Sequence, residues 1–168
     1  MRLSVSLPEY IGSGVDVFWE NNSVAVIEAS SNCVTIKATK EAFVSFAKQM
    51  LYFCFNTMPS GTHVHYDSFF CKSKLIGLGV LIELKEDDRE TDMYGFDDMS
   101  NLIDLYIPDD PFDDLWFSNA YISVTYNVDE VCICGNRAAL FGVAKKCYRY
   151  ATHAVKKSLL QNIVIPSS

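Results

Sequence analysis

The sequence predicts an α+β protein in which one strand–strand–strand–helix–strand unit occurs twice, with a mainly antiparallel sheet and two helices packed on one face. The chain matches itself without a gap at a spacing of 97 residues. Each copy contains one segment with a single apolar helical face, and alternating apolar residues precede that segment. The matched pairs are Trp19 and Trp116, Asn22 and Asn119, Val34 and Val131, Ile36 and Ile133, Ala42 and Ala139, Ala47 and Ala144, and Lys48 and Lys145.

In the first copy, alternating apolar residues predict strands around residues 3–7, 25–29 and 33–37. A helix is expected to follow Thr39, because a threonine hydroxyl readily caps the first backbone amides of a helix. Its apolar face consists of Phe43, Phe46, Ala47, Met50, Phe53 and Cys54. Strands around 63–67 and 78–84 complete this copy.

The second copy repeats these elements with one strand fewer at its end. Strands are expected at 103–107, 122–126 and 130–134, and the stretch "NIVIP" at 162–166 predicts the last one. Asn136 is the equivalent of Thr39 and is also a good N-cap. The helix that follows has its apolar face at Leu140, Val143, Ala144, Cys147, Tyr150 and Ala151, and its solvent side is expected at Arg137, Lys145, Lys146, Arg149, Lys156 and Lys157.

The chain of 168 residues is expected to form a single compact domain, residues 1–168. Two internal repeats, about 1–85 and 100–168, would share one core and be joined by an acidic segment at 86–99. The N-terminal stretch lacks the continuous apolar core of a signal peptide, and no apolar run is long enough for a membrane helix. We therefore expect a cytoplasmic protein whose six cysteines are reduced.

Negative charge is concentrated in the middle of the chain. Between Glu83 and Asp114 there are thirteen acidic and two basic residues, which gives −11, whereas the remainder carries +4 and the whole chain −7. Such a distribution disfavours binding to nucleic acid or to an anionic membrane, and it favours a basic partner.

The stretch "PSGTHVHYDSFF" places His63, His65 and Asp67 at alternate positions, so that a strand would point all three to one side. Two imidazoles and a carboxylate could supply three metal ligands, so a metal site is the more specific of the two interpretations of this face. The string resembles the H-x-H-x-D signature of metallo-β-lactamase-type hydrolases, but Ser68 stands where that signature requires another histidine. Because only His153 remains elsewhere, we expect no metal and no cofactor, and a structural or recognition role for the three residues.

Other chemistry has weaker support in the sequence. There is no nucleophile elbow, phosphate loop or dinucleotide fingerprint. A Cys71 nucleophile served by His65 is an alternative to a structural cysteine. Cys132 and Cys134 lack the two-residue spacer of zinc knuckles and redox motifs, and we expect them to be ordinary strand residues.

The first copy resembles a family of small bacterial immunity proteins of polymorphic toxin systems, the immunity protein 32 family. The similarity covers about residues 23–87 and lies in the order "VTIKATKEAFVSFAKQMLYF", "PSGTHVHYDSFF" and "LGVLIELKED". The loop "FFCKSKLIGLG" is more apolar and more basic than the family pattern, and the chain continues into a second, degenerate copy. The resemblance implies an α+β protein without catalysis that binds and neutralises the toxin domain of a cognate bacterial effector.

The acidic segment is the expected interface for such a toxin, which would present a basic active-site cleft. Exposed aromatic rings flanked by carboxylates suit an interface anchor with a steering rim. The expected partner-binding residues are Asp87, Asp88, Glu90, Asp92, Tyr94, Phe96, Asp97, Asp98, Asp109, Asp110, Phe112, Asp113 and Asp114.

Three alternatives remain open from the sequence. The acidic segment could be a solvated loop whose aromatic rings enter the core. The chain could be a metal-dependent hydrolase that uses His63, His65 and Asp67. It could also be a non-catalytic assembly protein that forms a homo-oligomer through an exposed strand edge.

Overall fold

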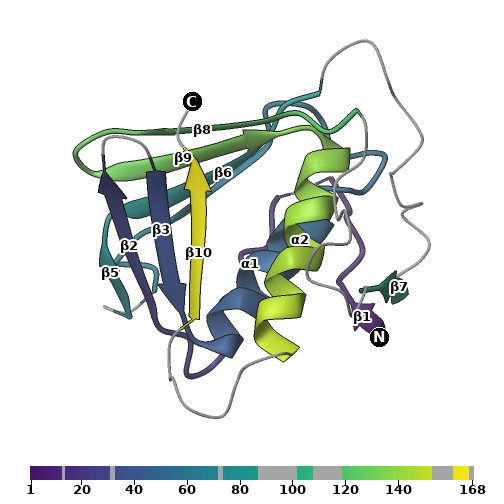
Figure 1. The fold of residues 1–168 in the computed structure, drawn as a ribbon. Helices are drawn as coiled ribbons and strands as arrows, with labels where there is room; N and C mark the ends of the chain where they lie inside the picture. The colour runs from purple at the N-terminus through teal and green to yellow at the C-terminus, as the bar shows by residue number, and fades with distance from the viewer. Residues whose placement is uncertain are drawn as a thin grey trace.

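The computed structural model describes residues 1–12, 14–30, 33–71, 74–86, 102–107 and 119–152, and the backbone of 161–166. It confirms the α+β class (Figure 1). The elements are β1 (Arg2–Ser6), β2 (Ala25–Ser30), β3 (Cys33–Ala38), α1 (Lys40–Tyr52), β4 (His63–Tyr66), β5 (Leu75–Gly77), β6 (Gly79–Leu84), β7 (Leu102–Tyr106), β8 (Ile122–Tyr126), β9 (Glu130–Gly135), α2 (Arg137–Thr152) and β10 (Gln161–Pro166).

The strands of the described residues form two four-stranded sheets and one two-stranded ribbon. The sheet orders are β10-β3-β2-β5 and β4-β6-β9-β8, and β1 pairs with β7 in the ribbon. Each four-stranded sheet contains one parallel pair, β2 with β5 and β6 with β9, whereas its other pairs are antiparallel. The sequence predicted mainly antiparallel pairing and missed these two parallel pairs.

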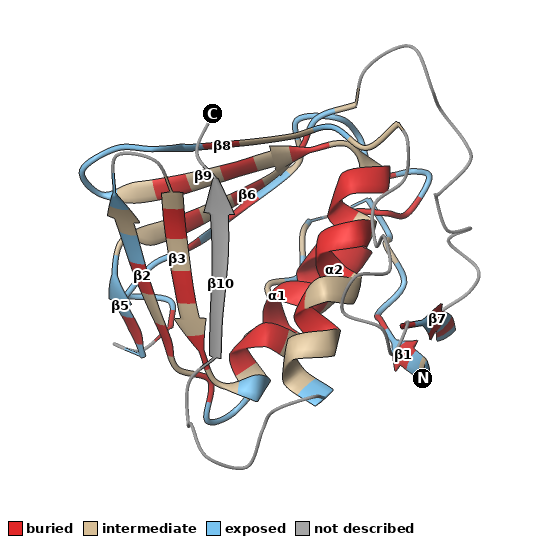
Figure 2. Ribbon diagram, in the orientation of Figure 1, coloured by how far each residue is buried: buried red, intermediate tan, exposed pale blue. Residues whose placement is uncertain are grey.

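The two halves of the chain exchange strands. β10, from the second half, pairs with β3, and β6, from the first half, pairs with β9. Helices α1 and α2 lie side by side (Figure 1), and the rings of Phe43 and Tyr150 stack between them with centroids 5.7 Å apart. One apolar core therefore contains buried residues from both halves (Figure 2).

The strand–strand–helix order occurs at the same 97-residue spacing in β2-β3-α1 and in β8-β9-α2. Both expected N-caps are present, since the Thr39 hydroxyl accepts from the Ala42 amide at 3.4 Å and the Asn136 side-chain oxygen accepts from the Ala139 amide at 3.0 Å. Each of these two side chains also accepts from the backbone amide of the residue just before the preceding hairpin, Val24 before β2 and Tyr121 before β8. Superposition of the two halves stays a prediction.

The chain turns a corner between β5 and β6, where it leaves one sheet and enters the other. The Leu78 amide donates to the Ile27 carbonyl at 3.1 Å, and the Gly79 amide donates to the Asp129 carbonyl at 2.8 Å. Gly77 has a φ of 87°, and a Cβ at this position would lie 2.2 Å from the Ile27 carbonyl oxygen. Glycine is therefore required here both by backbone conformation and by space.

The prediction that Arg137 lies on the solvent side of α2 is wrong. Its side chain is only 13% exposed and forms an ion pair with Glu86, with Nη1 and Oε1 at 2.7 Å. The guanidinium also donates to the carbonyls of Phe55, Asn56 and Met58 at 3.2, 3.2 and 2.6 Å. These partners lie in the segment after α1, which the position of Arg137 in the sequence does not reveal.

Candidate functional site

One surface of the β4-β6-β9-β8 sheet carries most of the chemically distinctive side chains. Residues on these strands alternate between buried and more exposed positions, so one surface packs on the core and the other does not. We call the second surface the polar face, and it carries His63, His65, Glu83, Glu130, Cys132 and Cys134. The pairing register aligns His63 with Glu83 and Cys134, and His65 with Leu81 and Cys132.

His63 and His65 lie on the same exposed side, as the sequence predicted, with ring centroids 5.3 Å apart. Their hydrogen bonds lead to other residues than Asp67. His65 Nδ1 lies 2.7 Å from Glu130 Oε1, and His63 Nδ1 lies 3.0 Å from the Gly61 carbonyl oxygen. The Asp67 carboxylate follows the strand and accepts from the Phe70 amide at 2.6 Å, so it stabilises a turn.

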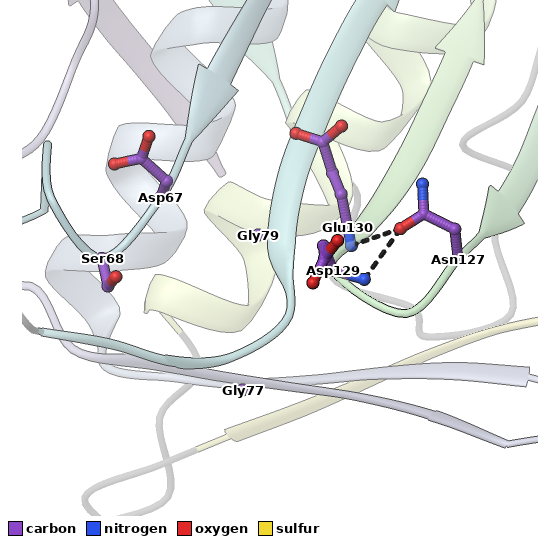
Figure 3. Close-up of a pocket in the computed structure, with 7 residues that line it drawn as sticks. All are labelled: Asp67, Ser68, Gly77, Gly79, Asn127, Asp129 and Glu130. Atoms are coloured by element: carbon purple, nitrogen blue, oxygen red, sulfur yellow. Dashed lines mark hydrogen bonds between the residues drawn. The ribbon is translucent and has the colours of Figure 1, made fainter.

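A groove lies beside the polar face, at the corner between β5 and β6. It has a volume of about 420 Å³ and is lined by Asp67, Ser68, Gly77, Gly79, Asn127, Asp129 and Glu130 (Figure 3). We call it the corner groove. Among the described residues, its lining has three carboxylates and no basic side chain. Asn127 holds the β8–β9 turn by accepting from the Asp129 and Glu130 amides at 2.8 and 2.9 Å.

Three exposed apolar residues are sequence neighbours of residues that line the corner groove. Phe69, next in sequence to Ser68, is 94% exposed, and Val128, between Asn127 and Asp129, is 89% exposed. Ile76, next to Gly77, is also exposed. The groove thus combines an acidic lining with exposed apolar residues next to it in sequence.

The second notable cluster joins Glu83, Cys132 and Cys134 at the other end of the polar face. Their ligand-type atoms all lie within 4.8 Å of one another. The two sulfurs are 3.2 Å apart, and the Cys134 thiol donates to Glu83 Oε2 at 3.1 Å. Burial, followed by the hydrogen bond to Glu83, raises the pKa of the Cys134 thiol above its usual value.

Sequence reasoning missed this cluster, since Cys132 and Cys134 were expected to be ordinary strand residues. The alternation of side chains along a strand places the two cysteines on one face, and that signal was available. Glu83 joins them only through the parallel pairing of β6 with β9, which the sequence did not reveal. Among the described residues, His63, His65 and Asp67 do not form a comparable cluster.

Cys71 does not have the surroundings of a nucleophile. Its side chain is buried, and burial together with the nearby Asp67 carboxylate raises the pKa of its thiol to about 12. The thiolate fraction at neutral pH is therefore very small.

The expected partner-binding residues cannot be placed by the structure. All thirteen, from Asp87 to Asp98 and from Asp109 to Asp114, lie outside the described residues. The corner groove lies in the described part of the chain and was not anticipated from the sequence.

Comparison with protein-family models, curated proteins and solved structures finds no match to this chain. Neither helix in the described part of the chain combines the length and the apolarity needed to cross a bilayer. The resemblance to the immunity protein 32 family stays a prediction.

Proposed function

We propose that this chain is an immunity protein that binds the toxin domain of a cognate bacterial effector in the cytoplasm and neutralises it without a catalytic step. The observation that carries the proposal is the corner groove, with three carboxylates in its lining and Phe69 and Val128 beside it. The resemblance of residues 23–87 to immunity proteins suggests the kind of partner, and β4, β5 and β6 belong to that stretch.

The groove suits a basic side chain of the partner. Lysine or arginine entering the groove would meet Asp67, Asp129 and Glu130, and none of the described lining residues is basic. Charge complementarity of this kind speeds encounter and selects the partner, while buried aromatic contacts slow dissociation. Covering Phe69 would also remove a large apolar surface from water, which is favourable.

The charge of the middle segment supports the same kind of partner. The thirteen acidic residues between Glu83 and Asp114 add to the negative field that attracts a basic toxin cleft. In this proposal the acidic residues of the middle segment supply long-range attraction, and the corner groove is the contact surface.

Binding kinetics with a candidate toxin domain, taken from a gene next to the one for this chain, test the proposal. Asp129→Asn should slow association and flatten its dependence on salt, because the change removes one steering charge. Phe69→Ala should speed dissociation about tenfold, which corresponds to about 1.4 kcal/mol, because it removes an apolar anchor.

Two matched variants control for unspecific effects. Glu9→Gln removes an exposed carboxylate outside the groove, and Tyr106→Ala removes an exposed ring on β7. Both should leave the two rate constants unchanged. Equal effects of Phe69→Ala and Tyr106→Ala, or no effect of either groove variant, would contradict the proposed interface.

A further inference from the structure

We infer that Glu83, Cys132, Cys134 and His63 bind a zinc ion on the polar face. Three of these side chains already bring a carboxylate oxygen and two sulfurs within 4.8 Å of one another. They come from two neighbouring strands, β6 and β9, whose parallel register sets Glu83 beside Cys134. The inference does not rest on the proposed function, because it uses none of the residues of the corner groove.

The donor set fits zinc better than a hard cation. Two thiolates favour a soft or borderline ion, whereas magnesium and calcium require oxygen ligands. Zinc accepts sulfur, imidazole and carboxylate ligands in a tetrahedron, and zinc–sulfur bonds of about 2.3 Å place two sulfurs roughly 3.8 Å apart. The observed separation of 3.2 Å between the sulfurs therefore has to widen only by a fraction of an ångström.

His63 is the neighbour that completes the tetrahedron. It stands directly opposite Glu83 in the antiparallel pair of β4 and β6 and is exposed, so its ring has room to turn toward the ion. With Nδ1 bonded to the Gly61 carbonyl, the neutral ring carries its proton on Nδ1 and leaves the lone pair on Nε2. A histidine that binds a metal through one ring nitrogen usually donates the N–H of the other to a carboxylate, a backbone carbonyl or water.

The binding of one Zn²⁺ is balanced in charge by the release of two protons. Without the ion, the Cys134 thiol donates to the Glu83 carboxylate. When zinc binds, Cys132 and Cys134 each release a proton to solvent and form a zinc–sulfur bond, while Glu83 and His63 donate lone pairs. The ion would then link β4, β6 and β9, which belong to both halves of the chain. The site is thus expected to stabilise the fold, as closed four-ligand zinc sites do.

Cobalt titration of the reduced protein tests the site. Co²⁺ is a coloured probe for zinc sites, and thiolate ligands give it a strong charge-transfer band in the near ultraviolet. One equivalent should produce this band, and Zn²⁺ should remove it. Cys132→Ser and Cys134→Ser should each weaken or abolish the band, while Glu83→Gln and His63→Ala should lower the affinity about tenfold or more.

Cys33→Ser is the matched control, because Cys33 is also a half-buried thiol on a strand and lies outside the cluster. This variant should bind cobalt like the unchanged protein. Absence of the band, or a band that Cys33→Ser removes and Cys134→Ser leaves intact, would overturn the inference.

Alkylation of the unchanged protein keeps the test decisive if a cysteine variant does not fold. Zn²⁺ should protect Cys132 and Cys134 from iodoacetamide, as detected by peptide mass spectrometry, while Cys33 should be labelled as before. Equal labelling of Cys132 and Cys134 with and without the ion would overturn the inference.

Discussion

Arg137 illustrates at the scale of one residue how the two halves of the chain are held together. Its guanidinium lies at the start of α2 and contacts Glu86 as well as three carbonyl groups after α1. The Arg137 amide also donates to Glu86 Oε1 at 3.2 Å. Because both charged side chains are largely buried, removal of one leaves the other, and the carbonyls, poorly satisfied.

Arg137→Ala should therefore lower the free energy of unfolding by about 3 kcal/mol. Lysine keeps the charge but not the branched set of donors, so Arg137→Lys should recover only part of the loss. Chemical denaturation followed by circular dichroism measures both values. Lys40→Ala, which changes an exposed lysine, is the control and should stay within about 0.5 kcal/mol of the unchanged protein. A loss below about 1 kcal/mol for Arg137→Ala would contradict this account.

Individual residues were predictable where their partners are near in sequence. The capping roles of Thr39 and Asn136 follow from side-chain type and from the start of an apolar helical pattern, and the structure confirms both. The role of Arg137 was missed because its carbonyl partners lie 79 to 82 positions earlier in the chain. Helical periodicity assigns such a residue to the solvent side by default.

At the scale of elements, the corner between β5 and β6 decides how the two sheets meet. The chain crosses from a parallel pair with β2 to a parallel pair with β9 within a few residues. Hydrogen bonds from Leu78 to Ile27 and from Gly79 to Asp129 fix the two sides of the turn. The same corner sets the lining of the groove, which includes Gly77 and Gly79.

Gly77→Ala should destabilise the protein by about 3 kcal/mol or more, because it combines an unfavourable φ with a clash against the Ile27 carbonyl. Gly61→Ala is the matched control, since Gly61 has a φ of 88° but has open space around its Cβ position. That change should cost only about 1–2 kcal/mol. Thermal and chemical unfolding of the two variants separate the cost of the backbone conformation from the cost of the clash. Equal losses of unfolding free energy would show that the close approach at Gly77 contributes nothing.

The elements themselves were largely predictable, whereas two of their pairings were not. Alternating and helical periodicities located both helices and nine of the ten described strands, because these patterns are local. They missed β5, which lies in a stretch that the sequence predicted to be a loop. The pairing of β6 with β9 brings together segments about 50 residues apart along the chain, and apolar patterns do not specify such partners. For this reason the sequence did not predict the cluster of Glu83, Cys132 and Cys134. It did predict that His63 and His65 lie on one side of β4.

At the scale of the whole molecule, strand exchange and charge define what the protein presents to a partner. β10 joins a sheet of first-half strands, and the other four-stranded sheet takes two strands from each half, so both halves contribute to each sheet. The acidic corner groove lies where these two sheets meet, beside the exposed Phe69 and Val128. The central claim is that this surface captures a basic toxin and thereby protects the cell.

Growth protection in bacteria tests the central claim most directly. A candidate toxin domain from a neighbouring gene is expressed alone, with the unchanged protein, with Phe69→Asp, or with Tyr106→Asp. Growth and the amount of soluble protein are measured together. We predict that the unchanged protein and Tyr106→Asp restore growth, while Phe69→Asp accumulates to the same level but fails to protect. No protection by the unchanged protein would contradict the proposed function, and full protection by Phe69→Asp would contradict the corner groove as its interface.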